Sequence, residues 1–426
     1  MTMSNPDIIV STNKITTATP SATLSVDEAR SFIHSQVQAP SCIEKVAIRS
    51  SLGRFIAEDI LSSINVPSHT NSAMDGYAIN ATDLAPDKTV KLEVIATAFA
   101  GKPYSGQIKS GQCVRIMTGG MMPTGSDTVI MQEDVERNDD TIIIQTCHRA
   151  GQNVRAAGED LAIGQVAVQQ GQKVMPAELG ILASLGLSEV NVHRRLRVAF
   201  FSTGDELRSV GEVLGDGDIY DSNRYTLYGM LSRLGIEILD MGVIPDRPEA
   251  IKNAFKAASE NSDVIITSGG VSVGEADFVK ETLEAMGEVK FWKIAMKPGR
   301  PLAFGKIKEA FFFGLPGNPV AVMVTFYQFV QETLLSMSGA KSKPRLQLQL
   351  PTSTTFFRKM PGRTEFIRGV ISVDNNGNMI VSSSGQQGSG ILHSMSQANC
   401  FIILAHDDGP VNEGDIVTVE PFEGFI

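Results

Sequence analysis

The segment with the clearest chemical signature is a glycine-rich stretch that follows an apolar run at residues 263–267. Glycines at the carboxyl end of a strand let backbone amides approach an anion, and the N-terminus of the next helix adds partial positive charge. The stretch 268–277 therefore predicts a phosphate site, with a tight turn in which Asp277 merely caps a helix as the structural alternative. The residues expected to bind substrate here are Ser268, Gly269, Gly270, Ser272 and Gly274.

Acidic side chains follow segments that read as neighbouring strands. Glu206 follows the apolar run 196–201, Asp246 follows the run 236–243, and Asp277 closes the glycine-rich stretch. The carboxyl ends of parallel strands share one sheet edge, and Mg²⁺ is held by carboxylates together with substrate phosphates. Each carboxylate alone is explained as well by helix capping, but their convergence predicts a magnesium site formed by Glu206, Asp246 and Asp277.

Cations gather after the next apolar run, at 289–294. Three cationic residues lie within a stretch of eight, although the chain as a whole is acidic. They are Lys293, Lys297 and Arg300. Pro298 and Pro301 exclude a helix there, so we expect a loop that faces an anion, with a solvated basic loop as the alternative.

A second turn with glycine and proline joins an apolar strand to a helix over 321–337. Its residues Pro316, Gly317 and Asn318 are expected to line the ligand. Asn318 as the cap and Pro319 as the first helical residue explain the same pattern by helix capping alone.

These motifs need a scaffold in which strands and helices alternate. Helical stretches at 223–234, 248–260 and 275–286 separate the apolar runs, which predicts a doubly wound α/β domain. The chain of 426 residues is long enough for several domains. We expect a multidomain α/β plus β protein with a flexible extension at 1–24, a linker domain at 25–66 and 157–194, an inserted small β domain at 67–156, the α/β domain at 195–344 and a C-terminal β barrel at 345–426.

Composition excludes several classes of protein. A formal charge of −10 and a pI near 5.2 argue against a nucleic-acid binder, which needs clustered cations. The four cysteines lie far apart without a C-x-x-C pair, which favours a reducing compartment. Without a signal peptide or a sufficiently long apolar run, the chain is expected to be soluble and cytoplasmic, with no membrane partner.

Taken together, these and other motifs resemble the molybdopterin molybdenumtransferases, bacterial counterparts of the C-terminal domain of gephyrin. The resemblance covers residues 25–426, in order. The matching blocks are Ser72-Ala73-Met74-Asp75-Gly76-Tyr77, Arg115-Ile116-Met117-Thr118-Gly119, Gly158-Glu159-Asp160, Ser202-Thr203-Gly204-Asp205-Glu206-Leu207, Ser268–Asp277, Lys297-Pro298-Gly299-Arg300-Pro301 and Gly314-Leu315-Pro316-Gly317-Asn318-Pro319.

The resemblance implies that adenylylated molybdopterin and molybdate are converted into molybdenum cofactor, with release of AMP and help from Mg²⁺. It further implies a homodimer in which the α/β domain faces the β domain of the other subunit, and contacts with the molybdopterin adenylyltransferase and recipient molybdoenzymes. Positions that match functional residues of the family are Asp75, Thr118, Arg155, Asp160, Glu206, Asp246, Asp277, Lys293 and Lys297.

The predicted mechanism places Mg²⁺ near the three carboxylates at the pyrophosphate, while Lys293 and Lys297 neutralise developing charge. Two other functions stay open. Adenylylation of molybdopterin by ATP uses the same type of α/β domain, but needs neither the 67–156 domain nor the barrel. A pterin-binding scaffold without activity is the other, and it would be expected to have lost its acidic and cationic residues.

Overall fold

The computed structural model describes residues 23–37, 42–84, 88–145, 148–270, 278–355 and 361–422. The chain divides into two compact units. Unit 1 comprises Met1–Cys42 with Arg194–Ile426, and unit 2 comprises Ile43–His193.

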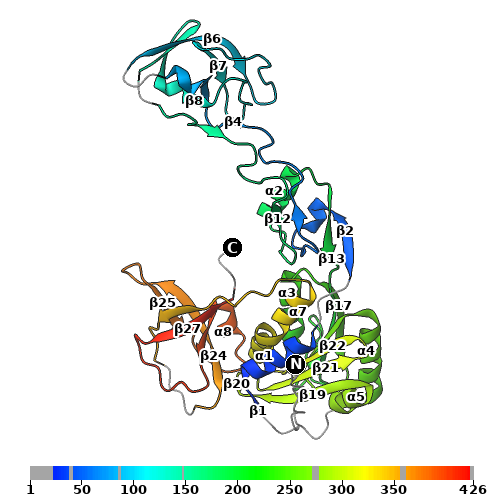
Figure 1. The fold of residues 1–426 in the computed structure, drawn as a ribbon. Coiled ribbons are helices and arrows are strands. Elements are labelled where there is room, and N and C mark those ends of the chain that lie inside the picture. The colour runs from blue at the N-terminus through cyan, green and yellow to red at the C-terminus, as the bar shows by residue number, and fades with distance from the viewer. Residues whose placement is uncertain are drawn as a thin grey trace, which may run out of the picture. The chain divides into compact units, whose positions relative to one another are not determined.

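The centre of unit 1 is a seven-stranded sheet in the order β1-β19-β21-β22-β18-β14-β17 (Figure 1). All pairs are parallel except those that β21 makes with β19 and β22, so every strand but β21 runs in one direction. The strands are β1 (Thr23–Leu24), β14 (Arg197–Thr203), β17 (Glu237–Ile244), β18 (Val264–Ser268), β19 (Gly287–Ile294), β21 (Pro301–Ile307) and β22 (Ala310–Leu315).

Helices cover both faces of this sheet, as the alternating pattern predicts. One face packs against α1 (Val26–Gln36), α3 (Ser222–Arg233) and the long helix that starts with α6 (Pro319–Thr325). The other face packs against α4 (Pro248–Asn261) and α5 (Phe278–Met286). Two apolar cores on opposite faces fix the sheet in the middle layer, and its strand ends are left to carry the site.

The helix α6 continues without a break through a π-helical turn (Phe326–Val330) into α7 (Gln331–Met337). By length and composition the helix Pro319–Met337 passes as a candidate membrane span, yet 67% of that window is buried inside the protein. Val320, Val324 and Phe329 belong to the core between helix and sheet. The helix Pro319–Met337 is therefore a buried part of the protein core.

The N-terminal helix corrects one predicted boundary. The helix begins as expected, with a capping box between Ser25 and Glu28. However, Val26, Ala29 and Ile33 are buried in the core of the α/β domain, and β1 adds a parallel strand to β19. Residues 25–37 therefore belong to unit 1 and not to the linker domain, because the apolar stripe of α1 packs on the core of the α/β domain.

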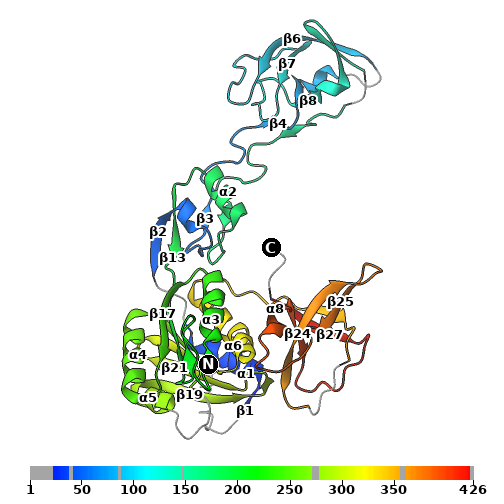
Figure 2. The ribbon, with the colours of Figure 1, turned by 180° about the vertical axis from the view of Figure 1, so that it is seen from behind.

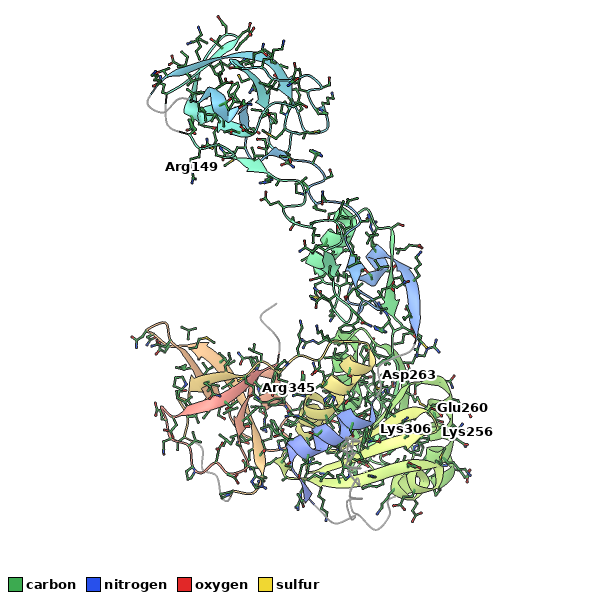
Figure 3. All side chains as sticks on the ribbon, in the orientation of Figure 1. Arg149, Lys256, Glu260, Asp263, Lys306 and Arg345 are labelled. Atoms are coloured by element: carbon green, nitrogen blue, oxygen red, sulfur yellow. The ribbon has the colours of Figure 1, made fainter. Side chains whose placement is uncertain are left out.

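The C-terminal part of unit 1 forms the predicted barrel. Its strands are β20 (Met296–Lys297), β23 (Leu348–Pro351), β24 (Thr364–Val373), β25 (Met379–Ser383), β26 (Cys400–Leu404) and β27 (Ile416–Pro421). A bridge from Thr352 to Val381 joins the end of β23 to β25, which closes the ring. Arg345, labelled in Figure 3, ties the barrel to the long helix through Glu420 and Gln328.

The described residues of unit 2 form three apolar cores, one in the linker domain and one on each face of the inserted sheet. The linker core forms where β2 (Ile43–Ala47) pairs with β13 (Glu189–His193) and α2 (Pro176–Ser184) packs on them (Figure 2). The inserted domain is a six-stranded sheet in the order β8-β5-β7-β6-β10-β9. These strands are β5 (Gly76–Ile79), β6 (Val90–Ala98), β7 (Gln112–Ile116), β8 (Thr128–Met131), β9 (Val135–Asn138) and β10 (Thr141–Ile144).

Candidate functional site

The carboxyl edge of the unit 1 sheet brings most of the predicted residues into one region. Because all strands but β21 run the same way, β14, β17, β18, β19 and β22 end at this edge. The turns that follow these strands carry the acidic residues, the glycines and the cationic loop. An open α/β sheet binds its ligands at this edge.

An acidic corner forms where β14 and β17 end. The backbone N–H of Asp246 donates to Oδ1 of Asp205 over 3.2 Å, which joins the two turns. Burial raises the pKa of Asp246, and the nearby charges of Asp205 and Glu206 raise it further. Gly204 has a φ of +150°, and a Cβ there would meet the Glu206 carboxylate at 2.6 Å, so glycine makes room for that side chain.

This acidic corner fits a divalent cation that bridges to phosphate. The carboxyl groups of Asp205 and Glu206 lie close enough to Asp246 for their charges to raise its pKa, and Mg²⁺ takes one or two carboxylates plus phosphate oxygens. Among the described residues no three His, Cys, Asp or Glu side chains form a complete metal cluster. The third predicted ligand, Asp277, lies outside the described residues, as do Ser272 and Gly274. The predicted set Glu206, Asp246 and Asp277 therefore stays a prediction.

The glycine turn after β18 lies next to this corner. Gly269 and Gly270 have φ values of +93° and +67°, and a Cβ on Gly269 would meet the Thr203 carbonyl at 2.9 Å. Asn223 at the start of α3 donates to Ser268 Oγ over 2.8 Å and to the Gly317 carbonyl over 2.7 Å. One amide thus couples two of the predicted substrate-binding turns.

Several buried oxygens at this edge have no hydrogen-bond partner among the described residues. Such groups are rare in proteins and indicate a ligand, an ion or water. The atoms are Ser202 Oγ, Thr267 Oγ1, Asp221 Oδ2 and Asn223 Oδ1, at the ends of β14 and β18 and the start of α3.

Lys297 lies at the other end of the edge, in a cavity shared with the barrel. The strand β20 pairs with β24 so that Lys297 stands opposite Glu365, and their charged groups are 3.5 Å apart. The cavity has a volume of about 280 Å³, and hydroxyls of Thr354, Thr355 and Ser383 help to line it. A small, mixed polar cavity with a cation suits a small oxyanion.

The structure does not bring the cations to the carboxylates. Between β19 and β14 lie β21, β22 and β18, so four inter-strand spacings of about 4.8 Å separate the strand ends by roughly 19 Å. Lys293 lies on the opposite face of β19 from Trp292 and Ile294, whereas Lys297 enters the barrel sheet. The prediction that Lys293 and Lys297 neutralise charge on a substrate bound beside the carboxylates stays a prediction, because strand order separates the strand ends but does not locate the bound substrate.

The remaining residues of the unit 1 loops have exposed or structural positions. The Arg300 carbonyl accepts from Ile294 N–H over 2.7 Å, and its side chain is exposed. Pro316 is buried, while Gly317 and Asn318 are exposed at the start of α6. Asn318 is the N-cap residue, as predicted, but its side chain makes no capping hydrogen bond, which leaves the side chain available to a ligand.

In unit 2 the predicted pair Asp75 and Thr118 is in direct contact. Asp75 Oδ1 accepts from the backbone N–H of Thr118 over 2.7 Å and from its hydroxyl over 2.8 Å. These bonds lower the pKa of Asp75, and the charge of Arg115 lowers it further. Arg155 on β11 (Val154–Arg155) pairs with the strand before Asp75, and Asp160 lies in an exposed turn held by Val66.

Sequence reasoning gave no role to three residues of the site. Asn223 lies in the first turn of the helix that Asp221 caps. Its side-chain amide at that recognisable helix start could have suggested a role from the sequence. Asp205 stands directly before Glu206, but its proximity to Asp246 depends on the β14–β17 pairing. Glu365 carried no signal, because only the parallel pairing of β20 with β24 places it beside Lys297.

Sequence models of protein families match the chain in three consecutive parts. Residues 24–186 match the MoeA N-terminal region (domain I and II). Residues 199–336 match a probable molybdopterin binding domain, and residues 352–422 match the MoeA C-terminal region (domain IV).

Whole-chain comparisons agree with these matches. The chain is 46% identical over 404 residues to the molybdopterin molybdenumtransferase of Haemophilus influenzae, which covers 95% of this chain and 100% of that protein. It is 34% identical to gephyrin of Dictyostelium discoideum, over 92% of this chain and 61% of gephyrin. A crystal structure of a molybdopterin biosynthesis moeA protein from Pyrococcus horikoshii superposes with a TM-score of 0.82 at 28% identity, over 94% of this chain and 100% of that one. The chain therefore belongs to the MoeA family of molybdopterin molybdenumtransferases.

Proposed function

We propose that this chain inserts molybdenum from molybdate into adenylylated molybdopterin and releases AMP, with Mg²⁺ as cofactor. Family membership carries the transferase activity. The observation that supports the finer statement is the composition of one sheet edge, where the acidic corner follows β14 and β17 and the segment that leads to the Lys297 cavity follows β19. The ends of β14 and β19 lie roughly 19 Å apart. A substrate with a pterin, a pyrophosphate and a nucleoside is long enough to use both.

The two halves of the edge take different parts of the reactants. Mg²⁺, when bound, would polarise the pyrophosphate from Glu206, Asp246 and Asp277. The glycine turn at Ser268–Gly270 holds the phosphate oxygens beside that corner, since its backbone carries φ values that leave space for an anion. Lys297 and the hydroxyls of its cavity hold the molybdate oxyanion at the other half.

The proposed reaction exchanges one anhydride for molybdenum–sulfur bonds. Once molybdate is bound, a water at the acidic corner attacks the adenylyl phosphorus, the anhydride P–O bond breaks, and AMP leaves. The dithiolene thiols at the pterin end of the substrate then replace oxygens on molybdenum, which leave as water with the thiol protons. Lys297, and Lys293 through a longer reach, offset the negative charge that collects on the oxyanion side.

We also propose a homodimer, in which Asp75, Thr118, Arg155 and Asp160 of one subunit complete the site of the other. Segment 210–228 of unit 1 supports this proposal, because it exposes large apolar side chains that a second copy could cover. Val213 is 92% exposed, and Ile219, Tyr225 and Tyr228 are exposed as well. Analytical ultracentrifugation of an Ile219→Glu/Tyr228→Glu variant should show a monomer. A dimer of unchanged affinity would contradict this interface.

The reaction would take place in the cytoplasm, where thiols stay reduced. Cys42, Cys113 and Cys400, the cysteines among the described residues, form no disulfide. The molybdopterin adenylyltransferase would supply the substrate, and recipient molybdoenzymes would take the product.

The test is molybdate-dependent AMP release, followed by reconstitution of an apo-molybdoenzyme. We expect AMP to appear only when adenylylated molybdopterin, Mg²⁺ and molybdate are all present. Binding of the adenylylated pterin without AMP release would favour a scaffold. Pyrophosphate release from ATP and molybdopterin would favour the adenylyltransferase.

A further inference from the structure

A buried glutamine lies where the long helix of the α/β domain meets the barrel. Gln328 is fully buried and stands in the π-helical turn Phe326–Val330. In this turn the Gln331 N–H donates to the carbonyl of Phe326, five residues back, instead of four as in an α-helix. Single π-helical turns inside α-helices occur frequently at functional sites, so the surroundings of Gln328 are of interest.

The side-chain amide of Gln328 binds groups from three other segments of the chain. Its Oε1 accepts from Arg30 of α1 and, over 3.1 Å, from Nη1 of Arg345. Its Nε2 donates to Oε1 of Glu420 on β27 over 3.2 Å. Arg345 lies in the connection from α7 to β23. One neutral amide, with an acceptor oxygen and a donor nitrogen, therefore links the N-terminal helix, the long helix, the connection and the barrel.

Arg345 completes this network through the main chain of the π-helical turn. Its Nη2 donates to the carbonyls of Tyr327 over 2.9 Å and Gln328 over 3.2 Å, and its Nη1 donates to Oε1 of Glu420 over 2.8 Å. A planar guanidinium can bridge such spaced acceptors, whereas a lysine ammonium cannot. We name this set of side chains the barrel joint, and its members are Arg30, Gln328, Arg345 and Glu420.

The barrel joint is not arranged for the greatest stability. The two guanidinium groups share the oxygen of Gln328, and burial together with the charge of Arg345 lowers the pKa of Arg30. Glu420 is 8% exposed, and its Oε2 is buried without a partner among the described residues. Buried polar networks of this kind are costly, but they can fix one geometry of the parts that they join.

A displacement at the joint would reach the cavity of Lys297 through the barrel sheet. The sheet runs in the order β20-β24-β26-β27-β23. Glu420 lies on β27, whereas Glu365, which pairs with Lys297, lies on β24. Since β26 is hydrogen-bonded to both strands, β27 and β24 shift together. Lys297 follows closely on β19 of the α/β sheet, so such a shift changes its distance from the barrel wall.

We propose that Gln328 is a positioning residue for the transferase reaction, whose amide fixes the barrel on the long helix and thereby sets the width of the Lys297 cavity. Among the described residues that line this cavity, none belongs to the barrel joint. The joint therefore acts on the cavity from a distance, through the barrel sheet. This inference rests on the proposed function in one respect, that the cavity binds molybdate.

The first experiment measures AMP release by Gln328→Met in the full-length protein. Methionine has a side chain of similar length but no amide. The apparent KM for molybdate should rise about 10-fold, within the range that a displacement of about 1 Å can produce. The acidic corner and the glycine turn lie outside the barrel, so kcat and the KM for adenylylated molybdopterin should change by less than about twofold. A fall in kcat with an unchanged KM for molybdate would overturn the proposal.

Thr333→Val is the matched control on the same helix. Thr333 is 1% exposed, and its hydroxyl donates to the carbonyl of Phe329 over 2.7 Å, within the helix. The variant loses a buried hydrogen bond but leaves the barrel joint intact. It should therefore lower Tm without changing the KM for molybdate. An equal rise of this KM in Thr333→Val and Gln328→Met would overturn the proposal, because general loosening of the helix would then explain both.

Arg345→Lys covers the case that Gln328→Met does not fold. The side chain of Arg345, labelled in Figure 3, is 21% exposed, so its replacement disturbs the core less. In the absence of substrate, amide hydrogen exchange should rise in β24 and β27 of either variant and stay unchanged in β14. Unchanged exchange in β24 and β27 would contradict the proposal. Exchange does not depend on the reaction, so wild-type protein that releases no AMP would refute the proposed function, while exchange would still decide whether the joint fixes the barrel.

Discussion

Two aspartates predicted to be functional have opposite surroundings. Asp75 in unit 2 is exposed, and two bonds from Thr118 lower its pKa. Asp246 in unit 1 is half-buried beside Asp205 and Glu206, and burial together with these charges raises its pKa. The protein thus stabilises the anion at Asp75 by itself, whereas at Asp246 it leaves negative charge uncompensated, as a site does when a cation from outside completes it.

The largest expected effect comes from Asp246→Asn. Removing one carboxylate from the acidic corner should reduce the rate of AMP release by at least about 100-fold, since a cation at a phosphoryl group stabilises the transition state by several kcal/mol. The loss should shrink as Mg²⁺ is raised, which a titration at fixed substrate measures. Asp263→Asn is the control, because Asp263 pairs with Arg194 at the amino end of β18 and is labelled in Figure 3. If both variants lost the same fraction of the rate of AMP release, the carboxylate of Asp246 would have no special role in binding a cation.

Asn223→Ala tests whether the acidic corner needs the neighbouring turns. The amide makes two hydrogen bonds, to Ser268 and Gly317, and at about 1 kcal/mol each their loss corresponds to roughly 30-fold in kcat/KM. Steady-state kinetics with adenylylated molybdopterin would measure it. Asn191→Ala, which breaks an exposed bond to Glu58 in unit 2, should leave kcat/KM unchanged. If Asn223→Ala behaves in the same way, the two turns do not act together.

The contrast between these regions also marks what sequence could predict. Alternation of apolar runs placed β14, β17, β18 and β19 and their helices nearly where they are, since each element has its own local pattern. The Asp75 and Thr118 pair came only from the family resemblance. The distance between Lys297 and Asp246 was not predictable, because it depends on strand order, and the local pattern of β21 does not reveal that it enters antiparallel between β19 and β22. The prediction that α1 belongs to the linker domain was wrong for the same reason, because the apolar pattern of an amphipathic helix does not reveal which core the helix packs on.

Thr118→Val probes the other side of the comparison. It removes the hydroxyl donor to Asp75 and keeps the backbone donor, so the pKa of Asp75 should rise toward its ordinary value. One lost hydrogen bond of about 1 kcal/mol predicts a decrease in kcat of roughly fivefold. A carboxyl titration by NMR and single-turnover kinetics would measure both. Thr118→Ser, which retains the hydroxyl, should resemble the wild type, and a variant as slow as Thr118→Val would point to the methyl group instead.

The smallest effects concern stability and pH in metal-free protein. Asp75 has a lowered folded pKa, so its stabilising contribution is present above the unfolded pKa of 3.8 and is lost as pH falls through the folded value. Asp246 has a raised folded pKa, so it costs stability as pH rises from 3.8 through the folded value. At pH 7 Asp246→Asn should therefore raise Tm slightly and Asp75→Asn should lower it. Both differences should fade in melts at acidic pH, and changes of the same sign would contradict the comparison.

The pairing of β20 with β24 has a consequence for the evolution and engineering of this fold. The strand β20 comes from the α/β part of the sequence but pairs with β24 of the barrel. A protein cut after residue 344 would therefore lose the strand that pairs with Met296 and Lys297. Such a fragment would keep the acidic corner and yet lack the barrel residues, such as Glu365, that line the Lys297 cavity. We therefore do not expect either domain to work when it is replaced by the corresponding domain of another protein. Substitutions in β20 or β24 are expected to require matching changes in the other strand.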